Sequence, residues 1–154
     1  MKKILKIAAL ISALVFVAAQ FIRPDFSNPP VDPAQTLAAS AAAVPDDVRQ
    51  ILDRSCRDCH TNETRLPWYS YLQPPASFLA AHIDDGRREL NFSVWATYDK
   101  SRRRRKLDEI CREAEARAMP LPSYLWIHRA ARLSDEEIRA LCRWTEDESA
   151  RLAE

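Results

Sequence analysis

Two cysteines and a histidine form the most specific chemical pattern in this sequence. Cys56 and Cys59 are separated by two residues, and His60 follows at once. This Cys-x-x-Cys-His arrangement is typical of sites where a c-type haem is attached. A helical turn would place both thiols at the edge of the porphyrin and the imidazole beneath it. The pattern therefore predicts one covalent haem c on Cys56 and Cys59, with His60 as the proximal iron ligand.

Three other readings of the motif have to be weighed. A zinc site needs four ligands, usually two cysteine pairs, whereas Cys111 and Cys142 are isolated in the sequence. A redox dithiol of the thioredoxin type requires a βαβ context, and no strand pattern flanks the motif. A disulfide between Cys56 and Cys59 would not explain His60 or the neighbouring aromatic residues. Of the four interpretations, haem attachment therefore fits the motif best.

The second iron ligand is left open by the residues alone. Met119 is the one methionine besides Met1, and Pro120 follows it. A thioether is a suitable soft ligand for haem iron, and a proline would stiffen the loop that presents it. Met119 could equally fill a gap in the core, and His82 and His128 are competing ligands.

Further residues around the motif are candidates for contact with the haem. Trp68 and Tyr69 belong to an aromatic turn, and either could donate a hydrogen bond to a propionate, besides packing in the core. His82 lies on an apolar stripe and could contact the haem from there. Cys111 and Cys142 lie on the apolar faces of two different expected helices and could form a disulfide in an oxidising compartment.

The composition indicates which fold positions these residues. The chain has 154 residues, a net charge of +1, one glycine and ten prolines. So little glycine argues against a β-rich or Rossmann-type fold, and the low net charge gives no reason to expect a nucleic-acid partner. We expect an all-α, small cytochrome c-like domain around one haem.

Helical periodicity and end signals predict the main elements. A helix should begin at Pro45 and carry the motif, and a second should run over 75–85 and stop at Gly86. Ser93 is a candidate cap, and a longer helix is expected over 100–118. Ser134 and Glu137 form the capping box of a final helix.

The N-terminal segment predicts a membrane anchor. An apolar run over 4–22 follows Lys2 and Lys3, which would place the N-terminus in the cytoplasm. A cleaved signal peptide is the alternative. We expect an anchor over 1–23, a linker over 24–44 that is weakly helical over 34–43, and a haem domain over 45–154. The domain would then lie in the periplasm, tethered by a single pass through the bacterial inner membrane.

Five consecutive basic residues occupy 102–106. Acidic residues at helical spacing partly balance them, so a solvated helix face is the simplest interpretation. Docking to an acidic redox partner or to anionic lipid headgroups is the alternative.

Taken together, the sequence resembles the haem-binding domain family of small, membrane-anchored bacterial proteins with a single haem. The matching segments are 20–24, 56–64, 67–70, 82–95, 119–120, Tyr124, His128, 133–134 and Trp144. The resemblance implies an anchor, haem on Cys56 and Cys59, and His60 as proximal ligand, and it favours Met119 as distal ligand. Cys111 and Cys142 stand outside the family pattern.

These observations favour an electron carrier over a catalyst. Ligation by His60 and Met119 would fill both axial positions of the iron and raise its reduction potential. The alternatives are a peroxidase-like haem enzyme or a gas or redox sensor with a labile distal ligand, and a structural role in a respiratory complex. The family has no defined reaction that would decide among them.

Overall fold

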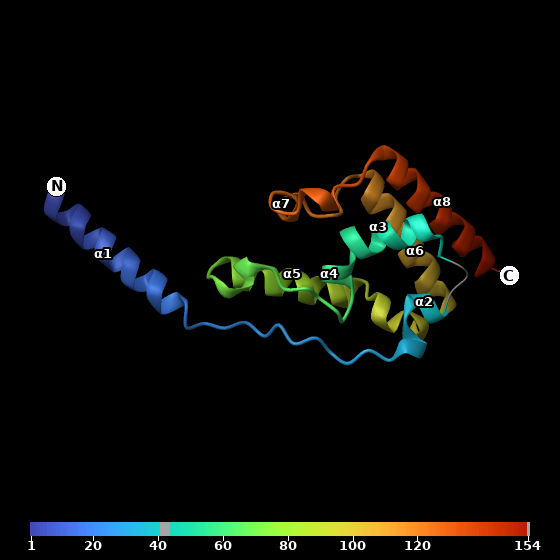
Figure 1. Ribbon diagram of the computed structural model, residues 1–154, viewed down its shortest axis with the longest axis horizontal. Helices are drawn as coiled ribbons and strands as arrows, with labels where there is room; N and C mark the ends of the chain where they lie inside the picture. The colour runs from blue at the N-terminus through green and yellow to red at the C-terminus, as the bar shows by residue number, and fades with distance from the viewer. Residues whose placement is uncertain (41–43, 154) are drawn as a thin grey trace.

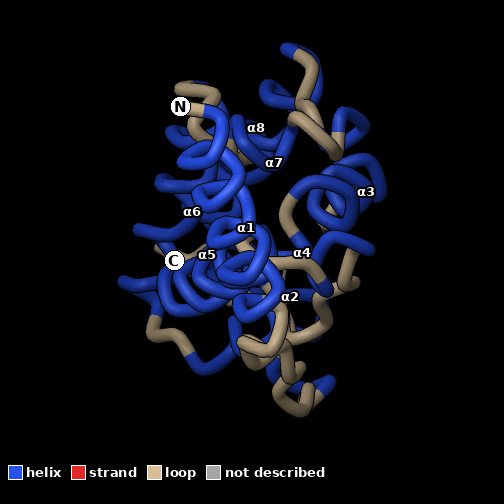
Figure 2. Tube along the Cα trace, turned by 90° about the vertical axis from the view of Figure 1, so that its left-hand side faces the viewer, coloured by secondary structure: helices blue, strands red, loops and turns tan. Residues whose placement is uncertain are grey.

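The computed structural model describes residues 1–40 and 44–153, and these contain helices and loops but no strand (Figure 2). The predicted all-helical fold is confirmed for these residues. The α-helices are α1 Lys2–Ala19, α2 Leu37–Ser40, α3 Asp46–Ser55, α4 Arg57–His60, α5 Pro75–Glu89, α6 Lys100–Glu115, α7 Pro122–Leu125 and α8 Asp135–Arg151. Short 3-10 helices are η1 Pro33–Gln35, η2 Trp68–Tyr71, η3 Phe92–Thr97 and η4 Arg129–Ala131.

The larger of two apolar clusters lies where α6 and α8 pack together, with α3 beside them (Figure 1). Apolar residues three and four positions apart give each helix one buried face. Leu107 of α6 and Leu141 of α8 are at most 1% exposed. A disulfide joins Cys111 to Cys142, with their Cα atoms 4.8 Å apart. This half of the domain is therefore held by apolar burial and by a covalent bond between its two longest helices.

The second cluster is smaller and lies beside the motif. Its buried members are Tyr69, Leu79 and Ile83, and Cys59 packs against them. Cys56, by contrast, packs against the larger cluster. The two cysteines thus stand at the boundary between the two apolar clusters of the domain.

The ends of the helices partly match the sequence prediction. The capping box at Ser134 and Glu137 is confirmed. The predicted cap at Ser93 is wrong, because the side chain of Asn91 accepts the hydrogen bond from the Ser93 N–H and caps η3. The helix expected over 100–118 ends earlier, at Glu115. Two residues later, Arg117 adopts a left-handed conformation (φ 53°), which closes the last turn.

The predicted stop at Gly86 is also wrong, since α5 continues through it to Glu89. Glycine often ends helices because it tolerates left-handed conformations, but Gly86 does not adopt one. Its role is a close contact that is described below.

The N-terminal helix corrects a second group of predictions. No helix among the described residues is long and apolar enough to cross a membrane. The lysine-free part of α1, residues 7–19, is about 20 Å long, whereas the hydrocarbon core of a bilayer is ~30 Å thick. The apolar run over 4–22 predicts one span, but α1 ends at Ala19 and carries lysines in its first turns. The predicted transmembrane anchor over 1–23 is therefore wrong, as are the membrane partnership through that helix and the single-pass inner-membrane localisation.

The segment between α1 and α3 is in contact with the rest of the chain. Leu37 of α2 is buried in the larger cluster. Asn28 exchanges two hydrogen bonds with the backbone of Thr64, which follows the motif. The weak helix expected over 34–43 corresponds in part to α2, and its last residues, 41–43, lie outside the described residues.

Candidate functional site

The motif forms a single helical turn of its own. α3 ends at Ser55. The backbone of Cys56 (φ −124°) departs from the helical conformation, and α4 begins at the next residue. The backbone N–H of His60 donates to the carbonyl of Cys56, which closes the turn at 3.0 Å. Both cysteines are free thiols. The local sequence thus sets two unpaired thiols and an imidazole on one tight turn.

Burial makes both thiols weak acids. It raises the pKa of Cys56 to about 12 and that of Cys59 to about 11. Both groups are therefore protonated thiols at neutral pH, with little of the reactive thiolate.

The imidazole of His60 is oriented by two backbone carbonyls. Its Nδ1 lies 3.0 Å from the oxygen of Gly86 and 2.9 Å from that of Leu90. Because a carbonyl can only accept, Nδ1 carries the proton and Nε2 keeps its lone pair. Burial lowers the pKa of His60, against the opposite effect of the two carbonyls, so the ring is neutral near pH 7. A neutral imidazole with a fixed tautomer is the form that binds a metal ion.

Gly86 allows α5 to approach the motif this closely. A Cβ atom at this position would lie 2.6 Å from the carbonyl oxygen of Cys59 and 3.1 Å from its Cβ. No side chain fits at that distance from backbone. The one glycine in the chain therefore stands where the carbonyl that orients His60 must come close to α4. That the chain contains a single glycine was a signal of a special role for Gly86. The prediction of a helix end there did not use this signal.

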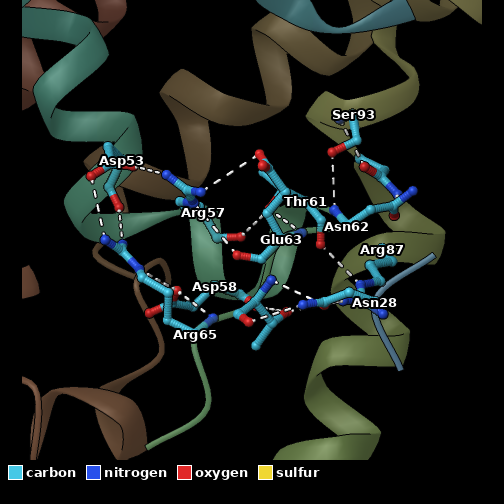
Figure 3. Close-up of polar contacts among 12 residues, drawn as sticks. Asn28, Asp53, Arg57, Asp58, Thr61, Asn62, Glu63, Arg65, Arg87 and Ser93 are labelled. Atoms are coloured by element: carbon cyan, nitrogen blue, oxygen red, sulfur yellow. Dashed lines mark hydrogen bonds and ion pairs between the residues drawn. The ribbon is translucent and has the colours of Figure 1, made fainter. Parts of the chain in front are cut away.

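Polar side chains fix α4 to α3 and to the loop behind it (Figure 3). Arg57 donates to the Asp53 carboxylate at 2.7 Å, which lowers the pKa of Asp53. Arg65 donates through Nε to Asp58 at 3.1 Å and through Nη2 to the backbone carbonyl of Asp53 at 2.8 Å. The two variable positions of the motif, Arg57 and Asp58, thus both serve to hold the turn.

Arg87 holds the loop that follows the motif. Its guanidinium donates to the carbonyl of Thr61 at 2.9 Å and to the hydroxyl of Thr64 at 3.0 Å. A further hydrogen bond reaches the Asn28 side chain at 2.6 Å (Figure 3). Arg87 follows Gly86 directly, so one turn of α5 fixes both His60 and the loop after it. The arginine had no distinguishing signal in the sequence beyond its place in the family resemblance.

Asp58 also connects the motif to the segment around α7. The hydroxyl of Tyr124 donates to its Oδ2 at 3.1 Å. The Tyr124 ring stacks on His128 at a centroid distance of 4.1 Å. His128 in turn lies 2.9 Å, Nε2 to hydroxyl oxygen, from Tyr69 of η2. Four side chains therefore link α4, α7 and η2, and no local pattern in the sequence predicts this link.

The other predicted residues are placed as follows. Trp68 is 70% exposed, whereas Tyr69 is buried and its hydroxyl bonds His128. His82 donates through Nδ1 to the Phe78 carbonyl at 2.7 Å, which leaves its Nε2 available. Met119 is 38% exposed, on the loop between α6 and α7. In the described part of the chain, no hydrogen bond or ring contact joins Met119 or His82 to the motif.

Cys111 and Cys142 are brought together by the fold, although they are 31 residues apart. With Glu115 they form a group of ligand atoms within 4.8 Å of one another, the only such group found among the described residues. Their sulfurs are already bonded to each other. The fold therefore does not unite them with Cys56 and Cys59 in a four-cysteine zinc site.

Exposed apolar side chains are concentrated on two segments. Beyond residue 22 of the described chain, the large apolar residues that are more than a third exposed are Leu66, Trp68, Tyr71, Leu72, Phe78, Met119, Trp126 and Ile127. All of them lie within 66–78 or 119–127, and none lies on α3, α6 or α8. In Figure 1 both segments extend to the same side of the domain, toward α1. Apolar surface gathered in this way normally marks a binding site.

Fold and site together define a small all-helical domain with a metal-competent histidine, two adjacent thiols and neighbouring uncovered apolar surface. The sequence profile of the haem-binding domain family matches residues 14–147. The chain therefore belongs to this family and is a haem-binding protein. No curated protein and no solved structure matches it.

Proposed function

We propose that the chain is a c-type cytochrome, with one haem bound covalently to Cys56 and Cys59, and that it transfers single electrons. The observation that carries the proposal is the orientation of His60. Two carbonyls hold the proton on Nδ1, so the lone pair of Nε2 is free for an iron, directly beside two unpaired thiols. When bound, the haem supplies an iron centre that alternates between the ferrous and ferric states.

The chain's own residues have distinct tasks in this proposal. Cys56 and Cys59 would hold the haem through two thioethers, each formed by addition of one S–H across a vinyl group, which needs no external oxidant. His60 would bind the iron through Nε2. Met119 would supply a second ligand, because a thioether suits haem iron and its loop lies beside the uncovered apolar surface. Trp68, Phe78 and Trp126 exclude water from the bound macrocycle.

A second function is favoured by one observation. His82 uses Nδ1 in a hydrogen bond, so its Nε2 can act as an acid, a base or a ligand. If Met119 leaves the iron, the site would serve as a peroxidase-like haem enzyme or as a sensor of small gaseous ligands.

Absorption spectra of the purified protein test the distal ligand. We expect a low-spin haem with the weak far-red band of methionine-sulfur ligation, and we expect Met119→Ala to abolish the band. A high-spin spectrum with rapid CO binding by the reduced wild type would contradict the carrier and favour the second function.

Denaturing gels stained for haem test the attachment. Cys56→Ser combined with Cys59→Ser should remove all covalently retained haem. The matched control is Cys111→Ser with Cys142→Ser, which removes the same number of sulfurs and should leave the stain unchanged. Retention of haem by the first variant would refute the attachment site.

A further inference from the structure

The loop that carries Met119 is attached to the rest of the domain at both ends. At one end, Arg117 donates to the carbonyl of Leu133 at 3.1 Å and pairs with Asp135 at the start of α8. At the other end, the Tyr124 hydroxyl donates to Asp58 at 3.1 Å. Met119 therefore lies on a short span between an attachment to α8 and an attachment to the motif itself.

The attachment at Asp58 is built from groups that are specifically paired. The Asp58 side chain is 21% exposed, and Arg65 holds its Oδ1, so that Oδ2 is left for Tyr124. A hydrogen bond to a charged acceptor is stronger than one between neutral groups. Tyr124 is then braced from behind by His128, which stacks on its ring and bonds Tyr69.

We propose that Asp58 and Tyr124 are positioning residues that hold the 117–128 segment against the motif and thereby keep Met119 over the haem. This inference rests on the proposed function for its consequence at the iron. The contact itself does not depend on that function, because it is a hydrogen bond between two side chains of the protein, Tyr124 and Asp58. Loss of the contact should let the loop move away and open the distal side to external ligands.

Two measurements on Tyr124→Phe test the proposal. The variant removes one oxygen and keeps the ring that stacks on His128. Amide hydrogen exchange over 119–128 should become at least about tenfold faster, since a hydrogen bond to a charged group is lost. In the reduced haem-loaded protein, the rate of CO binding should rise by a similar factor, and the far-red band should weaken.

Ser101→Ala is the control, because it also removes a single hydroxyl. Ser101 belongs to α6, its side chain is exposed, and its hydroxyl has no hydrogen bond among the described residues. This variant should change neither exchange nor CO binding. Asp58→Asn keeps an oxygen acceptor for Tyr124 and should lie between the wild type and Asp58→Ala in both measurements.

The outcomes separate this inference from the proposed function. Unchanged hydrogen exchange in Tyr124→Phe overturns the inference, whether or not haem is attached. Faster exchange with unaltered CO binding also overturns it, because the contact would then not control the distal side. Wild-type protein that retains no covalent haem refutes the proposed function instead, and the exchange measurement on that protein still decides whether Asp58 and Tyr124 hold the segment.

Discussion

The two ends of the domain are stabilised in different ways. Around α6 and α8, Leu107 and Leu141 are buried and a disulfide joins the helices. Around η2 and α7, Trp68 and Trp126 are 70% and 78% exposed, and hydrogen bonds hold the segments: Tyr69 bonds His128, and Tyr124 donates to Asp58 of α4. In the first region, the apolar side chains are buried by the protein itself. In the second region, several apolar side chains stay exposed to solvent, and an apolar macrocycle bound there would bury them.

Truncation of a core leucine should show the contrast most strongly. Leu107→Ala should lower the free energy of unfolding by about 3–5 kcal/mol, because the cavity it leaves lies among tightly packed helices. Leu79→Ala in the smaller cluster should cost closer to 2 kcal/mol, since that site can collapse more easily. Urea denaturation of the protein as isolated gives both values. Equal losses of unfolding free energy would show that the two clusters are equally tightly packed.

Removal of the Cys111–Cys142 disulfide should be next in size. The bond closes a loop of 31 residues, for which loop-closure entropy predicts about 3–4 kcal/mol of stabilisation. We expect Cys111→Ala with Cys142→Ala to lose this amount in urea denaturation and to keep its covalent haem. A normal unfolding midpoint in the variant would contradict the prediction. Loss of haem with intact stability would instead reverse the division of roles between the two regions.

Gly86→Ala should affect the site region through the backbone. In a helix interior this substitution ordinarily stabilises by about 0.5–1 kcal/mol. Here the added Cβ would lie 2.6 Å from the Cys59 carbonyl, so α5 must move away. We expect a loss of about 1–3 kcal/mol and a shifted haem spectrum, because the carbonyls that orient His60 move with α5. Ala81→Ser, on an exposed position of the same helix, is the control and should change neither property. Stabilisation by Gly86→Ala would contradict the close contact.

The same contrast explains how far the sequence could be read. Helical periodicity and the Ser134 capping box are local signals, and they predicted the all-helical fold and the start of α8 correctly. The role of Gly86 depends on a contact with Cys59, 27 positions earlier in the chain, and no local pattern encodes it. The partnership of Asp58 with Tyr124 is likewise a long-range contact.

The errors at the N-terminus have a different cause. The apolar run over 4–22 does not by itself indicate where the helix ends. α1 ends three positions before the run does and carries lysines in its first turns, so its lysine-free part is shorter than a membrane span requires. The residue types of the motif were thus enough to indicate the cofactor. Which residues hold the motif in place could be seen only in the fold.

The smallest expected effect concerns Glu137, which joins α8 to α3 within the first region. Its carboxylate accepts from the Ser134 N–H at 2.8 Å and from Arg54 of α3 at 2.7 Å. Burial of the carboxyl raises its pKa, but the hydrogen bonds from Ser134 and Arg54 outweigh this and hold the pKa of Glu137 below its usual 4.5. Because the folded-state pKa is the lower one, the stabilisation is present above pH 4.5 and is lost as pH falls through the folded-state pKa.

Glu137→Gln should therefore cost about 0.5–1 kcal/mol at pH 7, a value kept small by the partial exposure of both partners. The difference from the wild type should shrink when urea denaturation is repeated at successively lower pH below 4.5. Glu136→Gln, one position earlier and exposed, should be neutral within a few tenths of a kcal/mol throughout. The haem spectrum should not change in either variant, because Glu137 acts on the junction of α3 with α8 and not on α4. A difference that stays constant from pH 7 to pH 3 would show that the carboxylate charge is not what stabilises this junction.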